Sequence, residues 1–116
     1  MRPLILFLSG ILGAAGVALA AAASHAAETR LLGSASTMCL VHAPALIALH
    51  AAYRQIRTAT LGALLIALGT LLFAGDLLAR HFLGSGLFPM AAPAGGMTMI
   101  LGWLVVAVGA FFKAKP

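Results

Sequence analysis

The sequence contains very little negative charge and almost no cysteine. Of its 116 residues, 2 are acidic and 1 is cysteine. A single cysteine excludes an intramolecular disulfide and any CxxC pair. Charged residues make up 8 % of the chain, whereas an ordinary soluble domain carries about a quarter. Together with an apolar content of 63 %, this composition excludes an ordinary soluble protein.

Motifs that carry catalysis or nucleotide binding are also missing. The sequence has no HExxH, no glycine-rich phosphate loop between a strand and a helix, and no interpretable Ser, His and acid order. We therefore expect a protein that is not an enzyme and that uses no cofactor or metal. The net charge of +5 does not predict nucleic-acid binding, because the cations lie between or beside apolar segments.

Long apolar segments fill most of the chain instead. The clearest one runs from residue 58 to 79, and its only charge is Asp76. A helix of this length spans roughly 33 Å, enough to cross a hydrocarbon core of about 30 Å, and satisfies its backbone hydrogen bonds internally. The sequence predicts one all-α domain, residues 1–116, that forms an integral membrane four-helix bundle. Its transmembrane helices are expected at about residues 3–25, 37–53, 58–80 and 94–112.

The basic residues are distributed unevenly between the two sides of these helices. Two of them, Arg30 and Arg80, belong to one side. The other side carries Arg2, Arg54, Arg57, Lys113 and Lys115. The positive-inside rule then predicts a multi-pass protein of the bacterial inner membrane, with both termini and the second loop in the cytoplasm.

The first apolar segment also has features of a secretory signal peptide, with small residues around Ser24-His25-Ala26. Its apolar run of about 21 residues is longer than the 7–15 residues of a signal core. We therefore expect this segment to be retained as the first transmembrane helix.

Glycines recur at short, regular spacing in three of the predicted helices. Small residues at such spacing let helix backbones approach closely in lipid. In the last helix, the spacing of seven predicts a groove that packs against the first or third helix with a left-handed crossing. The predicted helix-packing glycines are Gly10, Gly13, Gly62, Gly69, Gly95, Gly102 and Gly109.

Four ionisable side chains form a candidate polar cluster within the membrane, where such groups are costly. Asp76 precedes Arg80 by one turn, which is the favourable orientation for an ion pair. Because the first two helices are antiparallel, His25 and His42 are predicted at similar depth in the outer half of the bundle, with Asp76 in the same layer. We expect a structural cluster without a metal; metal or haem ligation by the histidines and a proton relay are the alternatives.

Three segments together resemble a known family. They are His42 to Leu46 (HAPAL), Leu72 to Gly75 (LFAG), and Pro93 to Trp103, which begins PAGG and ends GW. Their order and spacing, over roughly residues 9–112, are similar to the domain of unknown function 423 family, small inner-membrane proteins with four predicted spans. That family usually has a small hydroxyl residue where this chain has Asp76. The resemblance implies the fold and the location, and it implies no activity.

We expect a non-enzymatic accessory or scaffold protein that contacts the lipid bilayer and packs against another membrane protein or further copies of itself. A small transporter or channel component for an ion or solute is the first alternative. Transporters typically contain broken helices and internal repeats, and no convincing repeat relates the two halves of this sequence. A metal- or haem-binding module that uses His25 and His42 is the second alternative.

Overall fold

The computed structural model describes residues 2–27 and 29–114, and all the regular structure of these residues is helical. The elements are α1 (Arg2–His25), α2 (Arg30–Ala51), α3 (Ala59–Leu83), α4 (Ala91–Val108) and the 3-10 turn η1 (Gly109–Phe111). Four helices, α4 being extended by η1, are long and apolar enough to cross a membrane. The prediction of an all-α protein with four membrane-capable helices is therefore confirmed.

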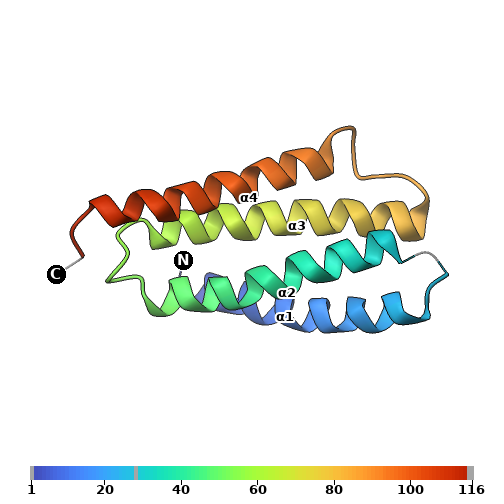
Figure 1. Ribbon diagram of the computed structural model, residues 1–116, viewed down its shortest axis with the longest axis horizontal. Coiled ribbons are helices and arrows are strands. Elements are labelled where there is room, and N and C mark those ends of the chain that lie inside the picture. The colour runs from blue at the N-terminus through green and yellow to red at the C-terminus, as the bar shows by residue number, and fades with distance from the viewer. Residues whose placement is uncertain (1, 28, 115–116) are drawn as a thin grey trace.

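The helices form an elongated bundle whose Cα extents are 51 × 26 × 19 Å (Figure 1). In this bundle α3 packs against both α2 and α4, while α1 packs mainly against α2. The two termini and the α2–α3 connection lie at one end, and the other two connections lie at the opposite end (Figure 1). As a result α3 is the most buried helix, and α1 and α4 keep wide apolar faces on the outside.

The contact between α1 and α2 follows a regular spacing of buried residues. The buried positions of α1 alternate between three and four residues apart: Ile5, Ser9, Leu12, Gly16, Leu19 and Ala23. This spacing keeps one narrow stripe against a neighbouring helix. At the centre of the stripe, the Ser36 hydroxyl of α2 donates to the carbonyl oxygen of Gly16 at 2.8 Å. A Cβ atom at Gly16 would lie 2.7 Å from Leu40 Cγ, so the two helices meet where α1 has no side chain.

The second helix is longer than the sequence predicted. The prediction that it begins at Thr37 is wrong, because α2 begins at Arg30 and includes most of the segment predicted as a loop. Within these additional turns, Leu32, Ala35 and Ser36 are buried in the bundle. Tertiary packing of this face stabilises helical turns that the local sequence, with its glycine and serines, does not favour by itself.

Candidate functional site

Asp76 is a fully buried carboxylate in the last third of α3. Its Oδ2 accepts a hydrogen bond from Arg80 Nε at 2.9 Å, and its Oδ1 accepts one from the backbone N–H of Leu87 at 2.8 Å. A buried charge is tolerated when it is paired and hydrogen bonded in this way. One carboxylate therefore joins α3 to the α3–α4 connection.

The α3–α4 connection approaches this carboxylate so closely that position 86 has no room for a side chain. A Cβ atom at Gly86 would collide with Asp76 Oδ1 and would lie 3.3 Å from Arg80 Nε. The connection begins at Gly84, whose φ of 82° favours glycine. Sequence reasoning missed Gly86 as a site residue, since a loop rich in glycine and proline does not reveal which glycine meets a carboxylate.

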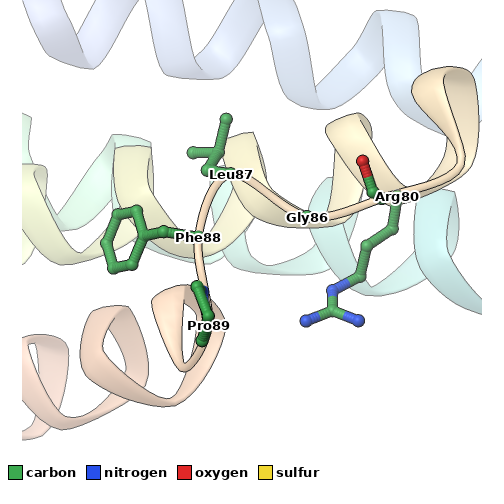
Figure 2. Close-up of a pocket in the computed structure, with 6 residues that line it drawn as sticks. Arg80, Gly86, Leu87, Phe88 and Pro89 are labelled. Carbon is green, nitrogen blue, oxygen red and sulfur yellow. The ribbon is translucent and has the colours of Figure 1, made fainter.

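Arg80 also borders an open hollow beside this connection (Figure 2). The hollow has a volume of about 400 Å³ and is lined by Arg80, Ser85, Gly86, Leu87, Phe88 and Pro89. The Arg80 side chain is 46 % exposed, although Asp76 is fully buried. The ion pair thus lies at the rim of the bundle, with its anion inside and its cation toward the outside.

His42 is buried in α2, and both nitrogens of its ring have partners. Trp103 of α4 donates its indole N–H to Nε2 at 3.1 Å, and Nδ1 lies 2.8 Å from the carbonyl oxygen of Met38. Because the indole nitrogen can only donate, Nε2 must be the unprotonated nitrogen, and Nδ1 donates to Met38. The imidazole is therefore neutral, and it joins α2 directly to α4.

The predicted layer of His25, His42 and Asp76 does not form. His25 is the exposed last residue of α1, whereas His42 lies about 18 Å along α2 from its start at Arg30. The prediction of similar depth is wrong because it assumed that the second helix begins at Thr37. Among residues 2–27 and 29–114, no three His, Cys, Asp or Glu side chains form a group that could hold a metal ion.

Four of the predicted packing glycines lie where α3 and α4 meet. A Cβ atom at Gly69 would lie 2.7 Å from the carbonyl oxygen of Gly95, and one at Gly95 would lie 2.8 Å from that of Gly69. Gly62 and Gly102 face each other in the same way, at 3.3 and 3.1 Å. Side chains do not fit at such short range, so the close approach of these two backbones depends on glycine.

The other three predicted packing glycines have different surroundings. Gly109 belongs to η1, and a Cβ atom there would lie 2.6 Å from Thr58 Oγ1. A Cβ atom at Gly13 would make an ordinary contact with Ala43 of α2, and one at Gly10, which is exposed, would meet no neighbouring element within 4 Å. The glycines of α1 are thus not equivalent, because only one face of that helix has a neighbour within the bundle.

Four helices long and apolar enough to cross a membrane, with hydrogen-bonded polar side chains buried between them, indicate a small multi-pass helical membrane protein. The chain belongs to the family described as Protein of unknown function (DUF423), whose model matches residues 5–96. The match extends from the first turn of α1 into α4 and includes Asp76, so the resemblance drawn from the sequence is confirmed. Searches of curated proteins and of solved structures found no match.

Proposed function

We propose that this chain is a non-enzymatic accessory or scaffold protein of the bacterial inner membrane, with both termini in the cytoplasm. The observation that carries the proposal is that the buried polar side chains hold the bundle's own elements together. Asp76 binds the connection that leads to α4, and His42 binds Trp103. Among the buried hydroxyl groups, that of Ser36 donates to α1, whereas those of Ser9 and Thr70 donate to carbonyl oxygens of their own helices. Polar groups used in this way favour a fixed bundle over a path for a solute.

The outward faces of α1 and α4 support an interaction with other molecules in the bilayer. On α4 the exposed large apolar side chains include Met97, Ile100, Leu101, Trp103, Leu104 and Val108. Such a face suits lipid chains and the helices of a neighbouring protein alike. The partners that we propose are therefore the bilayer itself and another membrane protein or a second copy of this chain.

The proposed orientation is supported by the arrangement of charge. The two termini and the α2–α3 connection lie together at one end of the bundle (Figure 1). Five Lys and Arg residues of the sequence belong to these segments, against Arg30 and Arg80 for the opposite end. Since basic residues are retained on the cytoplasmic side during insertion, the five-cation end is the one we assign to the cytoplasm.

Native size and solute flux test the proposed role together. The chain is extracted from its native membrane in mild detergent, and the mass of its complex is measured by light scattering. An accessory protein should elute in a complex heavier than one 11.7 kDa chain, and it should give no more ion flux in liposomes than protein-free controls. Flux that disappears in an Asp76→Asn or His42→Leu variant would instead support the transporter alternative. Haem absorbance or bound metal in the purified protein would support the metal- or haem-binding alternative.

A further inference from the structure

Tyr53, the only tyrosine of the chain, holds two arginine side chains at the end of the bundle that bears both termini. The guanidinium carbon of Arg2 lies 3.8 Å from the centre of its ring, and that of Arg54 lies 5.8 Å from the same point. Arg54 also donates from Nε to the Tyr53 hydroxyl at 3.1 Å. The start of α1 and the α2–α3 connection are therefore joined through one aromatic ring, which contacts two cationic side chains.

Further cations belong to this end, and none of the described residues there is acidic. Arg57 follows in the α2–α3 connection and Lys113 follows η1, and both side chains are exposed. The acidic residues of the sequence are Glu28, which belongs to the α1–α2 connection, and Asp76, which is bound within the opposite half of α3. A cluster of cations without a carboxylate creates a positive potential that attracts an anion.

Large exposed apolar side chains belong to the same segments of the chain as these cations. Leu4 and Phe7, near Arg2 on α1, are 46 % and 64 % exposed. Phe111 and Phe112, just before Lys113, are 87 % and 52 % exposed. An anionic phospholipid offers a phosphate with acyl chains directly below it, whereas nucleic acid or free phosphate offers the charge alone. The combination of cations and apolar side chains therefore fits a lipid.

We propose that the surface formed by Arg2, Tyr53 and Arg54, here the Tyr53 site, binds the headgroup phosphate of an anionic phospholipid. The phosphate lies between the two guanidinium groups, whose planar donors match its oxygen atoms. Tyr53 positions both guanidinium groups before the lipid binds, and Arg57 and Lys113 attract the anionic headgroup from farther away. This lipid site does not depend on the accessory role, because it requires only the end of the bundle to lie among headgroups.

Lipid selectivity in nanodiscs tests the Tyr53 site. The full chain is placed in phosphatidylcholine discs that contain a trace of spin-labelled phosphatidylglycerol or phosphatidylcholine, and the motionally restricted fraction gives the ratio of association constants. Since each basic group near a charged headgroup contributes a roughly fivefold factor, phosphatidylglycerol should be preferred at least about fivefold at low salt. Arg54→Gln should reduce this preference several-fold, and about 0.5 M NaCl should weaken it. Equal association of the two lipids would overturn the proposal.

Matched variants separate a positioned site from diffuse charge. Arg30→Gln removes one charge at the opposite end and should retain the selectivity of the unmodified chain. Tyr53→Leu keeps every cation but removes the ring, and it should reduce selectivity as strongly as Arg54→Gln. Tyr53→Phe, the milder change, should give a partial loss because the ring stays while the hydroxyl that accepts from Arg54 is removed; circular dichroism verifies the fold of each variant. An equal loss in Arg30→Gln, or unchanged selectivity in both tyrosine variants, would contradict a positioned site.

Competition distinguishes a lipid from soluble anions. Inorganic phosphate and a short DNA duplex are each added to the loaded nanodiscs at constant ionic strength, because salt alone weakens the preference. The restricted phosphatidylglycerol fraction should stay unchanged in both cases, since neither anion offers apolar contact. Displacement of the lipid by either would assign the cations to that anion and overturn the proposal.

Discussion

At the residue scale, the carboxylate of Asp76 replaces the solvation it loses on burial with donors from two parts of the chain. Arg80 comes from the same helix and Leu87 from the following connection. Gly86 permits this arrangement because its missing side chain leaves space for the carboxylate. We infer that Asp76 orders the α3–α4 connection.

An Asp76→Asn variant tests this inference at constant side-chain size. The amide loses the ion pair with Arg80 and presents an NH2 group where one oxygen accepted a hydrogen bond. We expect the Tm in detergent to fall by about 5 °C or more and the Leu87 amide to exchange with solvent faster, while the chain still inserts. Ser24→Ala is the control, because that hydroxyl bonds only within exposed α1. An unchanged Tm and exchange rate would mean that the carboxylate does not hold the connection.

The hydrogen bond between His42 and Trp103 gives a second residue-scale prediction. His42→Leu leaves the indole N–H without its partner, which should cost about 1–3 kcal/mol of stability. Because Trp103 is the only tryptophan, its fluorescence reports this site alone, and its emission should shift to shorter wavelength. The matched control is His25→Leu, since that histidine is exposed, and its emission should remain unchanged. Identical spectra for the two variants would exclude the bond.

At the scale of elements, the contact between α3 and α4 depends on backbone proximity. The paired glycines remove side chains at both contact levels, so the helices gain dispersion contacts that lipid chains alone do not supply. The rest of α4 is largely exposed to the surroundings of the bundle. The glycine face of α4 is therefore the surface through which α4 packs against α3.

Gly102→Leu should disrupt that attachment, because a Cβ atom there already meets Ile66 at 2.7 Å. Overpacking of this kind costs about 1–3 kcal/mol, to be measured as thermal unfolding by circular dichroism. Gly96→Leu is the control on the same helix, since no atom lies within 4 Å of a Cβ at that position. It should be neutral or stabilising, because glycine is unfavourable within a helix. Equal stability of the two variants would show that the glycine face of α4 is not packed.

At the scale of the whole molecule, chemical labelling of single cysteines tests the proposed orientation in the membrane. Cys39 is buried and is replaced by serine, so that a new cysteine at Ser85 or Ala114 becomes the only thiol. An impermeant thiol reagent applied to spheroplasts should label Ser85→Cys and spare Ala114→Cys until the membrane is opened. The reverse pattern would place the end with both termini outside the cytoplasm and contradict the orientation that the distribution of Lys and Arg predicts.

The sequence by itself determined the number and class of the helices. Long apolar segments require internal backbone hydrogen bonds in lipid, and this requirement is local to each segment. The Asp76–Arg80 pair was also predictable, because residues four apart on a helix are neighbours in any fold that keeps the helix.

Only the tertiary structure decided which distant groups meet. The start of α2 at Arg30 depends on packing against α1, and this earlier start places His42 away from His25. Trp103 binds His42 across 61 residues of sequence, and Gly86 meets Asp76 only because the connection folds back over α3. Contacts of this kind depend on how helices are arranged in space, and helical periodicity specifies the exposed and buried faces of a helix without specifying its neighbour.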